Sequence, residues 1–374
     1  MLDHYEDYRR VDRIADLFGP GNRIFELPEE APLVTPDHEV VLGTPGRVLG
    51  MHRRPIQLRI VKVDRVLCLA RRTLVNTANG KILFDGLRKP RQADEDVPEA
   101  YRKLAHPRRV RLILRHPDTR HVQGTAFCAA AANRGYGHVL LEGISQLWPA
   151  GEIDLARLPV AINGSAGSSD HPFDLARAFG VRRRNAVRID EGNVFFESII
   201  LATQSYILQK RISTRFWTVA GRIRDRYSPG AADRPASGRL YVSRRLAGKR
   251  RLLEEAAVED LFRERGFAVL HPEHASIAEQ VRAFASAAWV AGPVGSGLYN
   301  SIFSPADVRR IILAPAWFYT PNDVLMSRVH GPRYLFGRGP EHPKRAMVED
   351  WSIDVEAVRR ALDEILETED GNGA

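Results

Sequence analysis

Two clusters of residues suited to binding an anion follow predicted strands within residues 239–315. Ser243-Arg244-Arg245 comes after the alternating residues RLYV, and the glycine-rich stretch Gly292 to Asn300 comes after AAWVA. Ligands of parallel sheets bind at the carboxyl ends of strands, so we expect both clusters at one sheet edge. Guanidinium groups pair with phosphate oxygens, and backbone N–H groups at a helix start bind anions. The segment therefore predicts a site for a phosphorylated ligand, with a nucleotide as the leading candidate.

The glycine stretch GPVGSGLYN matches none of the common glycine motifs. It lacks the Gly-Lys-Ser/Thr ending of a P-loop and the G-x-G-x-x-G spacing of a dinucleotide site. A nucleophile elbow has glycines two residues before and two residues after its serine, and Ser296 lacks both. Two interpretations stay open from spacing alone. The loop either offers N–H groups to a phosphate or is a tight turn that lets a helix pack on the sheet.

A helix is predicted after Arg244, because Leu253, Ala257 and Leu261 recur at helical spacing and Gly266 can end it. Glu254 and Glu255 lie in its first turn, where negative charge is favourable. From spacing alone these two are helix-start residues without chemistry. Arg244 is interpreted as a ligand-binding residue, with a solvated surface charge as the alternative.

His138 stands at the start of another predicted helix, in NRGYGHVLLEGISQLW. A histidine there can act as a general base near neutral pH. A capping or packed imidazole is the competing interpretation, and spacing alone favours it. Asp94-Glu95-Asp96 matches a D-x-D metal motif only formally, since it lies in a charged loop and is predicted to be solvated. The remaining histidines and the cysteines lack metal-ligand spacing, so no metal site is predicted.

These residues need a scaffold of two domains, because 374 residues exceed one ordinary core. Strands and helices alternate through 239–315, which predicts an α/β fold. We expect an N-terminal domain at 1–224, with a β-rich segment of hairpins or a meander at 39–87. A linker is predicted at 225–238, a C-terminal domain at 239–345, and a C-terminal helix and tail at 346–374, with the helix at 352–366.

The composition is that of an ordinary globular protein, with 44% hydrophobic and 27% charged residues. No apolar run is long enough to span a bilayer, and the acidic start MLDHYEDYRR does not resemble a signal peptide. Cys68 and Cys128 lie in apolar runs, so we expect packed thiols in a reducing cytoplasm. The formal net charge is +9. Nucleic-acid binding ranks last because no reader module is recognisable, whereas peripheral contact with an anionic membrane stays open.

Several ordered motifs together resemble glycosyltransferase family 61 over about residues 125–365. They are YVSRR, RRLLEE, the run AEQVRAFASAAWVAGPVGSGLYNSIFSP, the upstream NRGYGHVLLEGISQLW and the C-terminal WSIDVEAVRRAL. The chain departs from the family pattern at two positions. Val294 stands where the family often has histidine, and Glu254 stands where it usually has asparagine.

The resemblance implies a GT-B architecture, two Rossmann-like domains facing a cleft. It makes 1–224 the acceptor-side domain and 239–345 the nucleotide-sugar-binding domain. It also implies inverting chemistry without a bound metal or another cofactor. His138 would be the catalytic base, and Glu255 would orient the ribose or the sugar. The residues expected to bind the donor are Arg244, Arg245, Arg250, Gly295, Ser296, Gly297, Leu298 and Asn300.

The expected function is transfer of a sugar to a glycan, polysaccharide or lipid-linked glycan acceptor. In this family such an activity belongs to bacterial capsule or surface polysaccharide biosynthesis, in the cytoplasm or at the inner membrane. The alternative is a degenerate, non-catalytic module that binds a glycan or nucleotide within a polysaccharide assembly complex. Val294 is the feature that favours this alternative.

Overall fold

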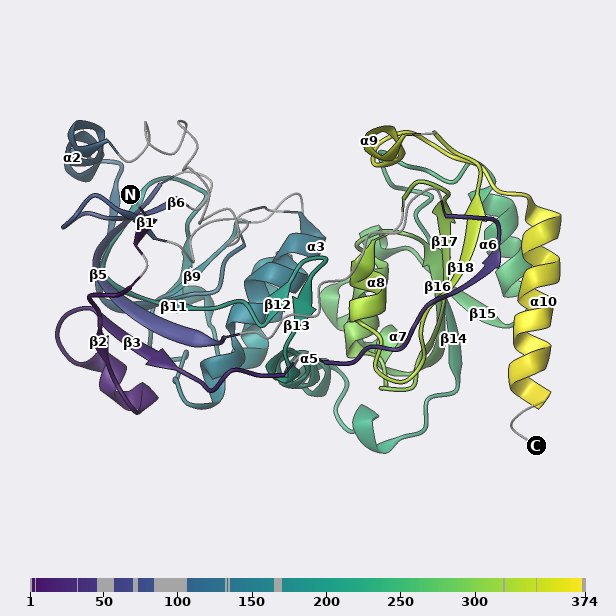
Figure 1. Ribbon diagram of the computed structural model, residues 1–374, viewed down its shortest axis with the longest axis horizontal. Helices are drawn as coiled ribbons and strands as arrows, with labels where there is room; N and C mark the ends of the chain where they lie inside the picture. The colour runs from purple at the N-terminus through teal and green to yellow at the C-terminus, as the bar shows by residue number, and fades with distance from the viewer. Residues whose placement is uncertain are drawn as a thin grey trace. The chain divides into compact units, whose positions relative to one another are not determined.

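The chain divides into two compact units, each described by itself (Figure 1). Unit 1 comprises Met1–Pro32, Arg54–Leu208 and Ile212–Arg222, and unit 2 comprises Leu33–Arg53, Gln209–Arg211 and Ile223–Ala374. The computed structural model describes residues 2–3, 5–31, 33–45, 57–69, 73–83, 106–131, 133, 135–164, 170–318, 320–340 and 342–371. The residues of the formal D-x-D motif, 94–96, lie outside these ranges.

The division between the units falls within helix α5 (Thr214–Tyr227). The expected linker at 225–238 therefore belongs to unit 2, where it holds the end of α5 and the short 3-10 helix η10 (Ala231–Asp233). Its proline and glycine residues surround these short elements.

Unit 2 is built on a sheet of six parallel strands in the order β15-β14-β16-β17-β18-β4. The strands are β14 (Gly238–Val242), β15 (Phe267–Leu270), β16 (Ala287–Pro293), β17 (Arg309–Pro315), β18 (Arg333–Gly337) and β4 (Glu39–Leu42). The two central strands, β16 and β17, are almost entirely buried, as expected where helices cover both faces of a parallel sheet. This arrangement confirms the α/β class.

The strand order turns between β14 and β16, because β15 pairs on the outer side of β14 while β16 and all later strands lie on the other side. Such a switch point is where open α/β sheets bind ligands, beyond the carboxyl ends of the strands. Gly292 allows the two strands to approach there: its φ is +151°, and a Cβ atom would collide with the Val242 carbonyl. Both anion-binding candidates thus follow the two strands that flank the switch point.

The expectation of local hairpins throughout 39–87 is wrong for β4. Strand β4 joins the sheet of unit 2, where Val40 aligns with Tyr334 of β18 in parallel register. The Glu39 N–H donates to the Pro332 carbonyl at 3.0 Å, and Arg333 pairs with the Glu39 carboxylate at 3.0 Å. Glycine turns near β4 suggested local pairing, but the open edge of β18 supplied its hydrogen-bond partner instead.

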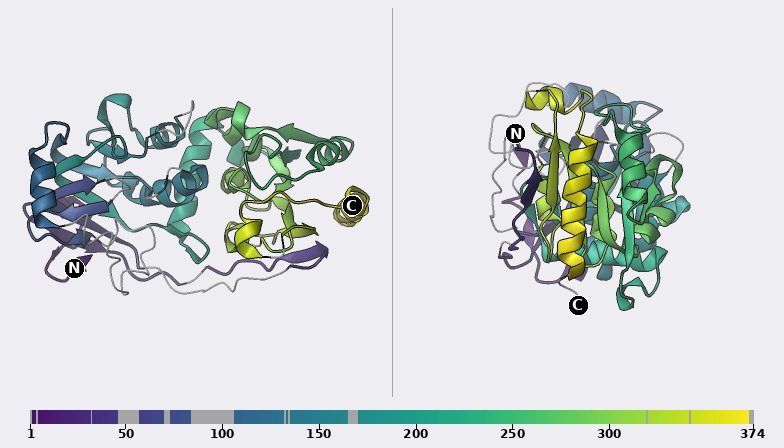
Figure 2. Two further views of the ribbon diagram at one scale, coloured as in Figure 1. Left: turned by 90° about the horizontal axis from the view of Figure 1, so that it is seen from above. Right: turned by 90° about the vertical axis from the view of Figure 1, so that its right-hand side faces the viewer.

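Helices cover both faces of this sheet, with α6 and α10 on one face and α7 and α8 on the other (Figure 1). Their bounds are α6 (Glu255–Arg263), α7 (Ile277–Ala285), α8 (Pro321–Leu325), α9 (Pro343–Ala346) and α10 (Val355–Gly371). The right-hand view of Figure 2 looks onto the face with α10 in front. Apolar residues of α6, α10 and the strands form one core on this face.

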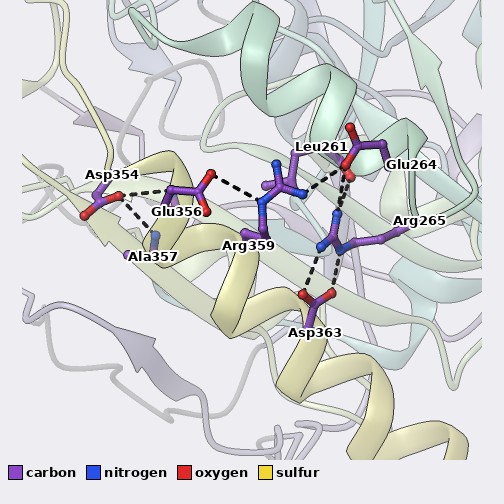
Figure 3. A network of polar contacts seen from close by, with 8 residues as sticks. All are labelled: Leu261, Glu264, Arg265, Asp354, Glu356, Ala357, Arg359 and Asp363. Carbon is purple, nitrogen blue, oxygen red and sulfur yellow. Dashed lines mark hydrogen bonds and ion pairs between the residues drawn. The ribbon is translucent and has the colours of Figure 1, made fainter.

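Ion pairs fix α10 beside α6 (Figure 3). The Arg265 guanidinium, just after α6, forms a two-bond pair with the Asp363 carboxylate at 2.6 and 2.9 Å, and Arg359 pairs with Glu264 at 3.0 Å. Helix α10 begins after Asp354, whose Oδ1 accepts from the N–H groups of Glu356 and Ala357. The helix predicted at 352–366 is thus present. It begins at Val355, because Asp354 is its capping residue.

Unit 1 is a mixed sheet around the long antiparallel pair β5 (Arg59–Leu69) and β11 (Val194–Ala202). Beyond β11, the strands β8 (Arg120–Cys128), β9 (Val160–Ile162) and β10 (Ala186–Arg188) run parallel. On the other side, β5 pairs antiparallel with β3 (Arg23–Glu26) and β6 (Thr73–Asn76), and β6 with β7 (Ile82–Leu83). The expected hairpins are present here.

Cys68 and Cys128 are buried in the apolar core of unit 1, as expected for packed thiols. The helix predicted after β8 is present but irregular. It starts as α3 (Tyr136–His138), widens into the π-helix η5 (Val139–Gly143) and ends as the 3-10 turn η6 (Ile144–Gln146). Within the described part of the chain, no helix combines the length and apolar character that crossing a bilayer requires.

Candidate functional site

Arg244 lies at the carboxyl end of β14 and turns its guanidinium toward the glycine loop after β16. Its backbone N–H donates to Glu255 Oε1 at 2.8 Å, and its Nη2 donates to the Lys249 carbonyl at 3.2 Å. A Cβ atom at Gly295 would overlap the guanidinium, so only glycine leaves room for Arg244 here. Burial lowers the pKa of Arg244, and Glu255 partly opposes this shift. The side chain is therefore half-buried against the loop rather than extended into solvent.

Arg250 brings a second guanidinium to the same place. Its backbone has the left-handed φ of +52°, which is uncommon outside glycine and marks a constrained position. The guanidinium lies over the Phe318 ring, 4.1 Å from its centre, and donates to the Val294 carbonyl at 3.4 Å. Burial and then the charge of Arg244 lower the pKa of Arg250 to about 10. The two cations thus repel each other in a poorly solvated place.

The Nε atoms of Arg244 and Arg250 are both buried without a hydrogen-bond partner among the described residues. Buried donors are nearly always paired, so each orphan requires an explanation. Two adjacent guanidinium groups with unused donors and mutual repulsion would be stabilised by an anion. This arrangement can bind a phosphate or diphosphate.

Three N–H groups of the glycine loop have no intramolecular use. Within the described part of the chain, Gly295, Ser296 and Gly297 donate no backbone hydrogen bond, whereas the next residue, Leu298, donates to the Gly295 carbonyl at 3.1 Å. The following helix η12 (Leu298–Phe303) is a short 3-10 helix. The first of these residues, Gly295, lies against the Arg244 guanidinium, as expected for a loop that binds an anion together with that arginine.

Asn300 anchors the glycine loop to α7 through a side-chain hydrogen bond. It is fully buried, and its Nδ2 donates to Gln280 Oε1 of α7 at 2.8 Å. Gln280 in turn donates to the carbonyls of Pro272 and Ala275. Leu298 is buried as well, so both residues anchor the loop through packing.

The side chain of Glu255 is buried, which its place at a helix start did not predict. Its Oε1 accepts from the Tyr241 hydroxyl at 3.2 Å and from the Arg244 N–H. Oε2 is buried without a partner among the described residues. Burial, reinforced by the Glu259 carboxylate, raises the pKa of Glu255 to about 7. Both glutamates lie at the start of α6, as predicted, Glu254 as its N-cap and Glu255 in its first turn. The Glu254 Oε2 accepts from the Ile353 N–H at 3.0 Å.

Arg245 is not brought together with the other two arginines. Its guanidinium is exposed and lies 3.9 Å from Glu259, and its backbone N–H donates to Ser243 Oγ at 3.0 Å. Ser243 Oγ donates to Glu259 Oε1 at 2.7 Å. The turn after β14 therefore sends successive arginines in different directions, which sequence alone does not reveal.

Sequence reasoning missed a polar cluster beyond the end of β17. Asp323 is fully buried, and burial raises its pKa to about 7, although the charges of Arg310 and Arg250 oppose the shift. Burial likewise raises the pKa of Tyr299 to about 12, with Asp323 adding to the shift. The available signal was the polar run TPND one strand further along the same sheet edge.

In unit 1, His138 forms a pair with Glu142, which the sequence analysis also missed. The Nδ1 atom lies 2.6 Å from Glu142 Oε2; the imidazole is 25% exposed and the carboxylate nearly buried. No hydrogen bond reaches Nε2 from the residues that the structure describes. A carboxylate on Nδ1 holds the tautomer in which Nε2 can accept a proton. The widened π-turn, a frequent feature of functional sites, carries this pair.

Among the described residues, no group of three or more His, Cys, Asp or Glu side chains is placed to hold a metal ion. Comparison with models of known protein families matches the Glycosyltransferase 61 family over residues 136–312. A search of the curated proteins gives no match. The matched region contains the His138–Glu142 pair, Arg244, Arg250 and the glycine loop, and it implies glycosyltransferase activity. The match over residues 136–312 supports membership of glycosyltransferase family 61.

Proposed function

We propose that the protein is an inverting, metal-independent glycosyltransferase that uses a nucleotide-sugar donor. The observation that carries this proposal is the pair Arg244 and Arg250 beside the glycine loop. Among the described residues, their buried Nε donors have no partner, and the N–H groups of 295–297 donate no hydrogen bond. A nucleotide-sugar supplies the missing anion as its phosphate groups. The position at the switch point between β14 and β16 supports the same assignment.

Each donor-site residue has a distinct task in this proposal. Arg244 and Arg250 bind the phosphates and balance the negative charge that grows on the leaving nucleotide. The N–H groups of Gly295, Ser296 and Gly297 complete the phosphate contacts. Glu255 offers its unpaired Oε2 to a hydroxyl of the ribose or the sugar. Arg245 is assigned no phosphate contact unless its side chain turns away from Glu259.

In the proposed reaction, the acceptor hydroxyl oxygen attacks the anomeric carbon from the face opposite the nucleotide. A new C–O bond forms as the bond to phosphate oxygen breaks, and the nucleotide leaves with the electron pair. The hydroxyl proton moves to His138 Nε2, and Glu142 stabilises the resulting imidazolium. The configuration at the anomeric carbon is inverted.

The family match supports a glycan or lipid-linked glycan acceptor, and the resemblance supports a role in bacterial capsule or surface polysaccharide synthesis. The GT-B architecture and a cytoplasmic location are part of the same proposal. Unit 2 has the fully parallel sheet that a Rossmann-like domain requires, whereas the sheet of unit 1 is mixed.

The test begins with a thermal-shift screen of nucleotide-sugars and nucleoside diphosphates, followed by hydrolysis and transfer assays with each ligand that binds. Arg244→Ala should weaken nucleotide binding by about 10- to 100-fold, the range expected for a lost charge-assisted contact. The matched control is Arg282→Ala, an exposed arginine of α7. Equal nucleotide affinity of the Arg244→Ala variant and the wild type would remove Arg244 from the donor site.

The competing function is a non-catalytic glycan- or nucleotide-binding module, which Val294 favours as the residue in place of the family histidine. Val294 is buried, and its N–H donates to the Leu313 carbonyl at 2.8 Å. Binding of a nucleotide-sugar without hydrolysis or transfer would support the module. Turnover that disappears with His138→Ala, while nucleotide binding persists, would support the enzyme.

A further inference from the structure

Four apolar side chains are exposed on two segments of unit 2. Leu246 and Leu253, in the segment after β14, are 48% and 64% exposed, and Met347 and Val348, just after α9, are 54% and 50% exposed. Single exposed apolar residues are common on protein surfaces and need no explanation. A group of them on adjoining segments suggests an interaction surface.

Backbone hydrogen bonds show that the two segments lie side by side. The Arg250 N–H donates to the Val348 carbonyl at 3.1 Å, and the Leu253 N–H donates to the Trp351 carbonyl at 2.9 Å. The Trp351 N–H returns a bond to the Arg251 carbonyl at 3.0 Å. Figure 1 shows α9 at the end of unit 2 seen at the top of the view. The two segments that carry the four exposed apolar residues therefore adjoin next to the proposed donor site.

Exposed cations surround these apolar residues, namely Arg245, Lys249, Arg251, Lys344 and Arg345. Carboxylates oppose some of them: Asp350 pairs with Arg251, Glu349 with Arg345, both at 2.6 Å, and Glu259 lies 3.9 Å from Arg245. Within the described part of the chain, Lys249 and Lys344 form no ion pair. We call these five cations and the four apolar residues the basic-apolar surface.

We propose that the basic-apolar surface docks the protein on a lipid bilayer that contains anionic headgroups. Apolar side chains set between cations match the interface of a bilayer, where acyl chains and charged headgroups adjoin. An acidic protein would satisfy the cations but would give the apolar side chains no defined partner. The proposal does not depend on the donor chemistry, because membrane binding is measured without substrate.

Helix α2 (Pro107–Arg115) of unit 1 provides a matched control. It carries Arg108, Arg109 and Arg111, and Leu112 is 72% exposed. Its other apolar residues, Val110, Ile113 and Leu114, pack against strands of unit 1. Helix α2 therefore offers similar charge with one exposed apolar side chain instead of four.

The test measures co-sedimentation of the full chain with phosphatidylcholine vesicles, with and without phosphatidylglycerol. Binding should require phosphatidylglycerol and weaken with added salt. Lys249→Gln with Lys344→Gln should lower the partition coefficient by roughly 25-fold, about 5-fold for each cation near an anionic surface. Leu253→Gln with Met347→Gln should lower it by about 10-fold or more. Arg109→Gln with Leu112→Gln should leave it near the wild-type value.

A dye on the thiol introduced by Met347→Cys gives a second readout, since the two native cysteines are buried. Its emission should shift to the blue on anionic vesicles, whereas a dye at Leu112→Cys should not respond. Three results would overturn the proposal: no binding to anionic vesicles, loss of binding only in the α2 double variant, or binding to polyglutamate but not to vesicles. The last result would point to an acidic protein partner.

Discussion

The Arg244 guanidinium occupies the space that a side chain at position 295 would fill. The loops after two neighbouring strands are thus matched in size. Arg244 after β14 has a long side chain, and Gly295 after β16 has none. The neighbouring Gly292 has a different reason, since it relieves a collision with the Val242 backbone. The glycine loop therefore serves both interpretations left open by its spacing. Gly292 permits close packing, and Gly295 leaves room for the proposed anion-binding arginine.

Gly295→Ala should weaken nucleotide binding by at least about 10-fold while leaving the fold intact. The new methyl group meets the tip of a flexible side chain, so Arg244 can turn away at little cost in stability. Calorimetry with the nucleotide found in the thermal-shift screen measures the affinity, and thermal unfolding measures the stability.

Gly248→Ala is the matched control for this substitution, because a Cβ atom there meets nothing within 4 Å. It should bind nucleotide as the wild type does. If Gly295→Ala also bound with wild-type affinity, the position of the Arg244 guanidinium would be irrelevant to the donor.

Glu255 should make unit 2 less stable as the pH rises toward neutrality. Its pKa is about 7 in the folded protein against an ordinary value of 4.5, so unfolding releases a proton between these values. Stability should then fall with rising pH by up to about 1.4 kcal/mol per pH unit for one such carboxyl group. Asp323, with a pKa raised to about 7, contributes in the same direction.

Thermal unfolding between pH 5 and pH 8 checks this expectation. Glu255→Gln should flatten the dependence, because the neutral amide has no proton to release, and Asp323→Asn should remove a further part. Glu152→Gln, a change at an exposed carboxylate, is the matched control. A Tm profile for Glu255→Gln that parallels the wild type would show that Glu255 is already ionised in the folded state.

Glu142→Gln should lower kcat by about 10²-fold or more with little change in nucleotide affinity. The amide can still contact His138 Nδ1, but it no longer balances the imidazolium that forms when Nε2 takes a proton. The pH profile of kcat should also shift, which a purely structural role would not cause. Turnover at the wild-type level in this variant would leave His138 without an orienting partner in the reaction.

The positions of the strands and the placement of the motifs after them could be predicted from the sequence where the signals are local. The alternation in RLYV, the apolar run AAWVA and the turn glycines define the strands before Arg244 and Gly292. The directions of neighbouring side chains could not be predicted, because one turn sends Arg244 toward Gly295 and Arg245 toward Glu259. The strand β4 was misassigned for a related reason, since its partner β18 lies almost 300 residues away in sequence. Glu142 carried a signal, four residues after His138 in a predicted helix, that went unused.

Val294→His tests whether a side chain at position 294 can contact the donor. The Val294 side chain is 1% exposed, and its N–H and carbonyl groups hold Leu313 and Arg250. A larger, polar imidazole there should cost roughly 1–3 kcal/mol and lower the Tm by several degrees. Nucleotide affinity should fall as well, because the loop that carries the Arg250 contact must shift. Val294→Thr, which replaces one methyl group with a hydroxyl at similar volume, separates polarity from size. If Val294→His instead retained stability and increased turnover, its imidazole would have to leave the core and reach the substrate, and Val294 would mark a lost catalytic contact.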